Sequence, residues 1–362
     1  MGRRKWGRWA LIGLATLLVV LSFLPAWQTD RWWVRQWDYP RLQVASLLVV
    51  ILLLLFWVDP KRRRGYWALF IGCAAAMAWQ VSHFLAYLPL YPREVASVDS
   101  CPVGQRLSLL NANVLMTNDD YSAVLAMAVA RKPDVLLLLE TGTEWKAAMA
   151  PLKRDYPYHL SEAVPNTYGM MLFSRLPMSG SITNLIQPGV PSAKVEIALP
   201  GGERILLNAL HPEPPWPGDD SGERDAELVM VGREVRDSGR ASIVMGDLND
   251  VAWSQTSQLF KDVSGMGDPR IGRGFYPTFN AKYPLLRWPL DHLFVSPHFR
   301  ISRIDVLESI GSDHFPIYFD LCLVAPAGKR LVKPSASGET ETEASSEIRE
   351  GKQEAAEENR GQ

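Results

Sequence analysis

The sequence has almost no net charge, few cysteines and no visible internal repeat. Its 38 Lys and Arg residues balance 39 Asp and Glu residues, for a formal net charge of -1. That balance removes any global electrostatic argument for binding nucleic acid or an anionic membrane surface. Only three cysteines occur in 362 residues, and none belongs to the candidate site described below, which excludes a thiolate metal site there. The absence of a repeat argues against a repeat architecture.

Long apolar runs are confined to the first ninety or so residues. They cover residues 9–27, 42–58 and 66–88, and each approaches the roughly 20 residues that cross the hydrocarbon layer as a helix. Any one of them could be a buried helix of a soluble core, and the first could be a signal peptide. Because the three follow one another with Trp and Tyr near their edges, we expect residues 1–92 to form a membrane anchor with three transmembrane helices.

Basic residues predict how this anchor is oriented. Arg3, Arg4, Lys5 and Arg8 precede the first run, and residues 61–64 form a basic loop after the second. Such residues remain on the cytoplasmic side, so three spans that start inside finish outside. We therefore expect a multi-pass protein of the bacterial inner (cell) membrane, with everything after residue 92 on the periplasmic or extracellular side.

Residues 93–324 alternate between strand and helix patterns and predict one α/β domain. Strand–helix–strand units are interrupted by hairpins of short strands, which favours two mixed sheets in an α/β sandwich. Another short strand is expected at 275–279. Residues 325–362 are rich in Glu, Ser, Thr, Gly and Ala, and this composition predicts a disordered acidic tail.

Polar side chains stand where several of the predicted strands end. The sharpest case is IVMGDLND at 243–250, in which an apolar strand stops at Asp247 and Asn249. Ligands of open α/β folds bind at such ends, whereas an Asx turn would explain one segment taken alone. Similar polar ends recur at Asn113, Glu140, His211, Asp291, Asp313 and His314.

These residue types indicate chemistry on phosphate. Carboxylate and amide oxygens suit Mg²⁺, with Mn²⁺ as an alternative. Magnesium keeps several waters and typically joins one or two carboxylates to a phosphate group. Two histidines close to such an ion can stabilise or protonate charge on phosphate oxygens. The reaction implied is hydrolysis of a phosphate ester.

Seven motifs in this order resemble the endonuclease/exonuclease/phosphatase superfamily of metal-dependent phosphohydrolases. They extend from about residue 106 to residue 323 and read LLNANV, PDVLLLLET, LFSRLPM, LNALHPEPP, VMGDLND, PLDHLFVS and GSDHFPI. The resemblance is to a membrane-anchored bacterial branch, and it implies a four-layer α/β/β/α sandwich in which the first and last strands are neighbours.

The resemblance also implies which residues hold the metal. Glu140 looks like the principal ligand, Asn113 would lie beside the metal and the phosphate, and Asp313 would add a second metal contact. If the first and last strands are antiparallel neighbours, Cys101 and Cys322 lie at the same end of them, and we predict a disulfide. Two free buried thiols are the alternative.

Five residues resemble the family's catalytic set. Asp247 is similar to the residue that orients or deprotonates the attacking water, and Asn249 to the one that holds the phosphate. His314 looks like the histidine that contacts the scissile phosphate, oriented by Asp291. His211 is similar to the histidine of the deoxyribonuclease and sphingomyelinase branches.

The resulting hypothesis is a membrane-tethered, Mg²⁺-dependent phosphoesterase that hydrolyses phosphodiester bonds on the extracytoplasmic side. A nuclease is one version, since Arg270, Arg273, Lys282 and Arg287 lie between the motifs. A phospholipid or lipid-linked phosphate is the alternative substrate, because the tether keeps the site near the lipid bilayer. A non-catalytic module that binds phosphate-bearing ligands is the rival from another class. No protein partner can be inferred.

Overall fold

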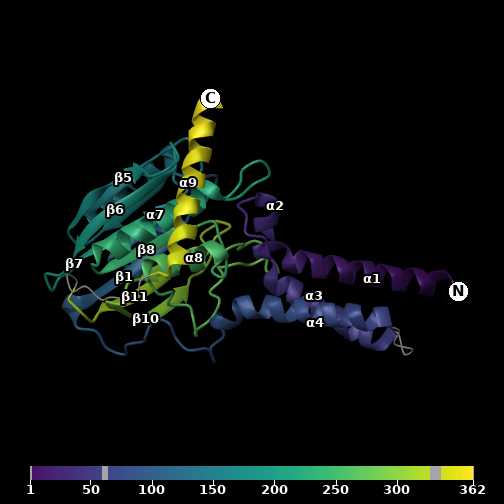
Figure 1. Cartoon of the computed structure of the whole chain (residues 1–362). Helices are drawn as coiled ribbons and strands as arrows, with labels where there is room; N and C mark the ends of the chain where they lie inside the picture. The colour runs from purple at the N-terminus through teal and green to yellow at the C-terminus, as the bar shows by residue number, and fades with distance from the viewer. Residues whose placement is uncertain (1, 59–63, 327–335, 362) are drawn as a thin grey trace.

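The computed structural model describes residues 2–58, 64–326 and 336–361, and its centre is a pair of β-sheets packed face to face (Figure 1). In spatial order, one sheet consists of β10 (Phe299–Val306), β11 (Ile317–Leu323), β1 (Arg106–Asn113), β2 (Val135–Leu139), β4 (Met170–Ser174) and β3 (Tyr158–Glu162). The other consists of β5 (Met178–Asn184), β6 (Pro191–Ala198), β7 (Arg204–Leu210), β8 (Ser242–Asp247) and β9 (Asp291–Val295).

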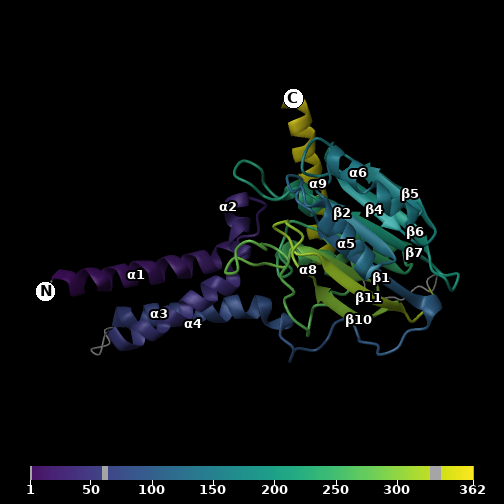
Figure 2. The same ribbon diagram turned by 180° about the vertical axis from the view of Figure 1, so that it is seen from behind.

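Helices cover the outer face of each sheet and complete four layers. The six-stranded sheet packs against α5 (Tyr121–Arg131) and α6 (Thr143–Ala148) (Figure 2). The five-stranded sheet packs against α7 (Gly222–Ser238) and α8 (Gln255–Ser264). Each sheet contains one parallel pair, β1 with β2 and β7 with β8, among antiparallel pairs. The predicted α/β/β/α sandwich of two mixed sheets is confirmed.

Side chains alternate along each strand, so the apolar residues on its two faces belong to two different cores. In β1, Leu107 and Leu109 face the opposite sheet, whereas Leu110 and Ala112 face the covering helices. The five residues of β2 are buried throughout because both of its faces are covered. Since successive side chains point to opposite faces, this phase decides which residues at the strand ends point into the space between the sheets.

A disulfide lies at the end of the sandwich where β1 begins. β1 and β11 are antiparallel neighbours, with Arg106 opposite Cys322. Cys101 and Cys322 form a disulfide with their Cα atoms 5.7 Å apart. It joins the segment before the first strand to the last strand. Cys73, in contrast, is a free and buried thiol among the N-terminal helices.

Three long helices project from the domain (Figure 1) and pack on one another. They are α1 (Gly2–Phe23), α3 (Arg41–Val58) and α4 (Arg64–Phe84). Two stretches, Trp6–Ala26 and Gly65–Tyr87, are long and apolar enough to cross a membrane. α3 meets that test only together with residues 32–38, from which it is bent by 70°. By length and composition, α1 and α4 thus match two of the predicted spans, and α3 would be the third only if it and residues 32–38 formed one bent span. The predicted basic loop at 61–64 lies outside the described residues except for Arg64, where α4 begins.

Short helices connect these long ones to each other and to the domain. Between α1 and α3 lie η1 (Leu24–Ala26), α2 (Trp32–Arg35) and η2 (Gln36–Asp38). After α4 comes η3 (Leu85–Tyr87), and η4 (Val103–Gln105) precedes β1. Inside the domain, η5 (Ala150–Arg154) follows α6. Residues 28–40, which we call the connecting segment, contact the domain directly, as described below.

The prediction of a disordered tail is wrong for residues 338–361, which form α9 (Gly338–Gly361). This helix lies along α7 and α8 (Figure 1). Ala344 packs in a small core with Val229 and Leu259, and Arg233 donates to the Glu341 carboxylate. A single apolar stripe and a few ion pairs are enough to hold a polar helix on an existing surface, although the overall composition is typical of disorder.

The short strand expected at 275–279 is a loop. Phe279 alone makes isolated bridges, to Trp288 and to His314. The aromatic side chains of this loop are half-buried. Phe275 packs with Tyr87 and Trp253, in a cluster formed by helices and loops, whereas Tyr276 packs against the core between the sheets. Apolar residues that pack outside a sheet give the same sequence pattern as those of a buried strand. The sequence could therefore not distinguish a loop from a strand at this place.

Glu227 makes the stability of the sandwich depend on pH. It is buried in α7 and accepts a hydrogen bond from the Ser192 hydroxyl. Burial raises the pKa of its carboxyl from 4.5 to about 7, and the Ser192 bond opposes this only in part. The folded state thus binds this proton more tightly than the unfolded chain, and the resulting stability is lost as the pH rises through about 7.

We therefore expect Glu227→Gln to raise the free energy of unfolding at pH 8 by about 2–3 kcal/mol and to change it little near pH 4.5. Denaturant unfolding at both pH values measures this difference. Glu162→Gln, on an exposed residue of β3, is the matched control. A gain from Glu227→Gln of equal size at both pH values would contradict the role of this buried charge.

Candidate active site

Polar side chains from both sheets meet at one end of the sandwich. Asn111 and Asn113 continue the alternation that points Leu107 and Leu109 of β1 between the sheets. Asp247 at the end of β8 and Asp291 at the start of β9 lie opposite each other in register. His211 directly follows β7 and is buried. Each of these strands thus contributes a polar residue where its apolar phase ends.

Glu140 follows β2 and joins this group through an unusual backbone conformation. Its φ of 58° lies in the left-handed region, which costs energy for a residue with a side chain and is frequent at functional sites. Asn113 Nδ2 donates to Glu140 Oε1 at 2.7 Å and to Asp247 Oδ2 at 3.0 Å. One amide therefore holds two carboxylates from different sheets together.

His314 lies between two further carboxylate contacts. Its Nδ1 is 2.9 Å from Asp291 Oδ2, and its Nε2 is 3.4 Å from Asp247 Oδ2. Asn111 Nδ2 donates to the other oxygen of Asp291 at 2.9 Å. The Asp291 carboxylate is thus fixed from both sides, and it fixes the orientation of the imidazole ring.

Burial and charge separate the two histidines. Burial alone would lower the pKa of His314, but the Asp247 and Asp291 carboxylates outweigh it and raise the pKa to about 10. Burial lowers the pKa of His211 to about 4, because the Asp247 carboxylate, 3.9 Å away, compensates only partly. At neutral pH, His314 is therefore a cation and His211 is neutral.

The carboxylates of the site are buried close to one another, and this disfavours their charged forms. Burial raises the pKa of Glu140, and the negative charges of Asp247 and Asp313 add to this shift. Burial likewise raises the pKa of Asp247, against the effect of His314. Clustered acidic groups of this kind favour a cation among them, because it relieves both desolvation and mutual repulsion.

The donor set fits a hard divalent ion. Asp247 and Asp291 offer carboxylate oxygens within 4.8 Å of each other, and Glu140 is joined to Asp247 through Asn113. The protonated His314 lies beside them as a cation and not as a ligand. The oxygens of Glu140, Asp247 and Asp313 are the ligands that Mg²⁺ and Mn²⁺ prefer. Asn113 presents its nitrogen to the carboxylates, and its Oδ1 accepts from the Leu115 N–H at 3.0 Å, so it positions the other ligands.

Asn249 lies at the edge of the polar group, and its backbone is held from several sides. Its φ is 49°, and its N–H donates to Asp247 Oδ1 at 3.0 Å. Its side-chain amide donates to the Pro212 carbonyl at 2.9 Å. Asp313 is half-buried and lies beside His314. Both residues line the same cavity.

This cavity has a volume of about 790 Å³ and leads from the polar group to the surface. Glu140, His211 and His314 form its polar part together with Asn249 and Asp313. Much of the remaining wall is aromatic, proline or leucine, and part of it belongs to the connecting segment between α1 and α3. This apolar wall includes Trp37, Pro40, Pro215, Trp216, Leu286 and Trp288.

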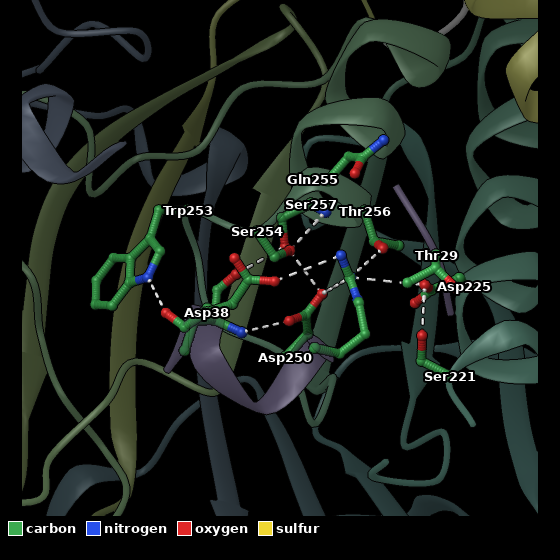
Figure 3. Close-up of polar contacts among 12 residues, drawn as sticks. Thr29, Asp38, Ser221, Asp225, Asp250, Trp253, Ser254, Gln255, Thr256 and Ser257 are labelled. Atoms are coloured by element: carbon green, nitrogen blue, oxygen red, sulfur yellow. Dashed lines mark hydrogen bonds and ion pairs between the residues drawn. The ribbon is translucent and has the colours of Figure 1, made fainter. Parts of the chain in front are cut away.

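The connecting segment also holds the loop that follows β8 (Figure 3). Arg35 Nη2 lies 3.5 Å from Asp250 Oδ2 and 3.6 Å from Asp225 Oδ2, and it donates to Thr256 Oγ1 at 2.6 Å. The Tyr39 hydroxyl donates to the Asn249 carbonyl at 2.6 Å. The site therefore depends on residues that precede the domain in sequence.

Charges balance in this buried cluster. Three arginines face three aspartates, and each of the six side chains is at most 6% exposed. Arg224 completes the support, because its Nη1 donates to the Asn249 carbonyl at 2.8 Å. The members of the cluster are Arg35, Arg41, Arg224, Asp38, Asp225 and Asp250.

All eight residues proposed from the sequence lie at this end of the sandwich. The sequence analysis missed Asn111, although it shares the phase of Asn113 and would have been found by following the alternation. It also missed the connecting segment, for which no motif exists. The polar residues at the strand ends were therefore visible in the sequence, whereas the contacts of the connecting segment were not.

Comparisons with known proteins agree with the fold. The model of the endonuclease/exonuclease/phosphatase family matches residues 110–314. No curated protein matches the chain. Among solved structures, an endonuclease/exonuclease/phosphatase from Beutenbergia cavernae DSM 12333 aligns with a TM-score of 0.50 and 19% identity, over 61% of this chain and 72% of that chain.

Two further structures are similar at lower scores. The human Nocturnin catalytic domain with bound sulfate has a TM-score of 0.49 and 15% identity, over 61% of this chain and 95% of that chain. Sphingomyelinase C from Streptomyces griseocarneus has a TM-score of 0.44 and 17% identity, over 59% and 99%. At these identities the similarity concerns the fold and carries no substrate.

Proposed function

The chain belongs to the endonuclease/exonuclease/phosphatase family, whose members hydrolyse phosphoester bonds, and we propose that it is a membrane-tethered, Mg²⁺- or Mn²⁺-dependent phosphodiesterase. One observation carries the proposal: the Asn113–Glu140–Asp247 group and the Asp291–His314 pair share a single buried site at the end of the sandwich. That combination places metal ligands beside a protonated histidine.

Glu140 and Asp313 would hold the metal ion, with Asn113 beside it. When bound, the ion neutralises charge on the phosphate oxygens and makes a neighbouring water more acidic. Burial, and to a lesser degree the Asp247 and Asp313 charges, raise the pKa of Glu140, so a cation held there would favour its charged form. Asn113 keeps Glu140 and Asp247 at the spacing that the structure shows.

Asp247 is the base in this proposal. Its Oδ1 accepts from the Asn249 N–H, and its Oδ2 accepts from Asn113, so the carboxylate cannot rotate away. The oxygen of an attacking water forms the new bond to phosphorus, and its proton passes to Asp247. The bond from phosphorus to the ester oxygen breaks, and the leaving oxygen takes a proton from solvent water to become the alcohol.

His314 stabilises the charge that develops on the phosphate. Asp291 fixes Nδ1 and keeps the ring charged, so Nε2–H can donate to a phosphate oxygen. His211 stays neutral and borders the same cavity. Asn249 donates one hydrogen of its side-chain amide to the Pro212 carbonyl, and the second could donate to a phosphate oxygen.

The arrangement of the N-terminal helices supports a tethered domain outside the cytoplasm. The connecting segment contacts the domain, so the junction of α1 and α3 lies on the domain's side of any membrane that the helices cross (Figure 1). The N-terminus lies at the far end of α1 (Figure 1). Basic residues at that end favour a cytoplasmic location, and the Cys101–Cys322 disulfide suits an oxidising compartment.

Metal removal tests this proposal. Full-length protein in detergent should hydrolyse bis(p-nitrophenyl) phosphate with Mg²⁺ or Mn²⁺, lose at least 99% of the rate in excess chelator, and recover it when the metal is returned. Isothermal titration with Mg²⁺ is the control for binding. A protein that binds Mg²⁺ and phosphate esters without turning them over would instead be the non-catalytic module.

A further inference from the structure

We propose that the natural substrate is a phosphate ester with an apolar chain, which enters the cavity from the lipid bilayer. The inference rests on the proposed function, since it places the phosphate of this molecule at the Glu140–Asp247–His314 site. It concerns the part of the cavity beyond that site, which hydrolysis of a small diester does not need.

The cavity combines two chemistries along its length. Its inner part is polar, whereas Trp37 and Pro40 of the connecting segment, with Trp216, Leu286 and Trp288, form the outer wall. The Tyr39 ring packs edge-on against Trp288 with centroids 5.8 Å apart. A ligand that is charged at one end and apolar along the rest matches this division.

The apolar wall lies where the long helices meet the domain. Pro40 immediately precedes α3, and Gln43, in the first turn of α3, donates from Nε2 to the Leu285 carbonyl at 2.9 Å. The loop that carries Leu286 and Trp288 therefore lies against the domain end of α3. If α3 crosses the membrane, this part of the cavity is at the bilayer surface.

Exposed apolar side chains surround the same region. Leu285, next to Leu286 of the cavity wall, is 85% exposed, and Trp216, itself part of that wall, is 62% exposed. Tyr283 in the same loop is 61% exposed. Exposed Trp, Tyr and Leu side chains together are unfavourable in water but typical of a membrane interface. A bilayer would cover them and let a lipid pass directly into the cavity.

The charges near the cavity argue against a nucleic acid. Among the described residues, its lining contains no Lys or Arg, whereas binding a polynucleotide requires several contacts to phosphates. Arg270 is buried against Asp268. Arg273 donates to the Val95 and Pro269 carbonyls, and Arg287 lies over the Phe315 ring. These three arginines are thus engaged within the protein, and of the four basic residues between the motifs Lys282 is the exposed one.

The experiment compares a lipid with its own head group. Full-length protein in detergent micelles is given phosphatidylethanolamine, phosphatidylglycerol and phosphatidic acid, or the deacylated glycerol phosphate esters of the same three lipids. We expect at least one lipid to be hydrolysed at least tenfold faster than its deacylated form, because each buried CH₂ group contributes about 0.8 kcal/mol. A single-stranded DNA and an RNA oligonucleotide are the remaining arms.

A substitution in the apolar wall tests whether the apolar chain of the substrate lies along it. Leu286→Asp should lower the ratio of lipid to deacylated-ester hydrolysis at least tenfold. Val103→Asp, at an exposed position before β1, should leave this ratio unchanged.

The outcomes separate this inference from the proposed function. If bis(p-nitrophenyl) phosphate is hydrolysed but none of the lipids is preferred, or if an oligonucleotide is the best substrate, the inference is wrong and the proposed function stands. If Leu286→Asp leaves the ratio unchanged, the apolar wall does not select the substrate. If no phosphate ester is hydrolysed at all, the proposed function itself fails.

Discussion

Glu140→Gln should lower kcat by about 10²–10⁴ without weakening the fold. Burial, and the negative charges of Asp247 and Asp313, raise the pKa of the Glu140 carboxyl. Without metal, the neutral side-chain amide of Gln therefore removes an unfavourable charge. The free energy of unfolding in chelator should therefore stay the same or increase. With metal, the variant should lose the stabilisation that binding gives to the wild type.

Turnover of bis(p-nitrophenyl) phosphate and thermal unfolding with and without 10 mM Mg²⁺ measure the two effects. Glu144→Gln is the matched control, because Glu144 is an exposed residue in the first turn of α6, four positions along the chain. It should retain both turnover and the Mg²⁺-dependent rise in Tm. If Glu140→Gln kept the wild-type kcat, Glu140 would not be a metal ligand.

Arg35→Met should have the second large effect, although Arg35 touches no substrate. Removing it leaves Asp250 and Asp225 with Arg224 as their remaining arginine partner among the described residues. Breaking a buried ion pair from one side costs about 3–5 kcal/mol, because the other charge stays buried without its partner. We expect this loss of stability together with a decrease in kcat, since Asp250 adjoins Asn249 in the loop after β8.

The pH dependence identifies the cause. Arg35 lowers the pKa of both Asp225 and Asp250 against the effect of burial, so its loss must raise both values. The stability deficit should then be full at neutral pH and shrink as the pH falls and the two carboxylates become protonated. Denaturant unfolding at pH 7.5 and at pH 5 measures it.

Two further variants keep this prediction falsifiable. Arg31→Met removes an exposed arginine that pairs with Asp220, and it should cost less than about 1 kcal/mol. Arg35→Lys should restore part of the stability and of kcat, because it returns the charge without the full geometry. A deficit in Arg35→Met that is equal at both pH values would indicate lost packing instead of unpaired charge.

The sandwich could be predicted from the sequence because its strands carry strong local signals. The DVLLLLE segment and the phase of Leu107 and Leu109 are visible in the sequence, and polar residues at the ends of such strands must lie between the sheets. Motifs then identified Glu140, Asp247 and His314, although only the structure gives their distances. Asn111 was accessible to the same argument.

The rest depends on contacts between distant parts of the chain. Arg35 and Thr256 are 221 residues apart, and nothing near Arg35 in the sequence shows that it will be buried. Likewise, α9 is polar overall and is held by Val229 and Leu259 of helices that precede it by many residues. Composition describes a segment by itself, whereas these segments are ordered by surfaces provided elsewhere.

The position of the connecting segment links catalysis to the biosynthesis of the protein. Arg35 leaves the ribosome long before Asp225 and Asp250 are made, so the segment must wait for the domain that will enclose it. In the proposed topology two spans, α3 and α4, lie between the connecting segment and the domain. A chain in which only one of them inserted would separate the two by a bilayer, and Trp37 and Pro40 would be missing from the cavity. Under the proposed function, only molecules in which both α3 and α4 have inserted would assemble the complete cavity, which ties activity to completed insertion.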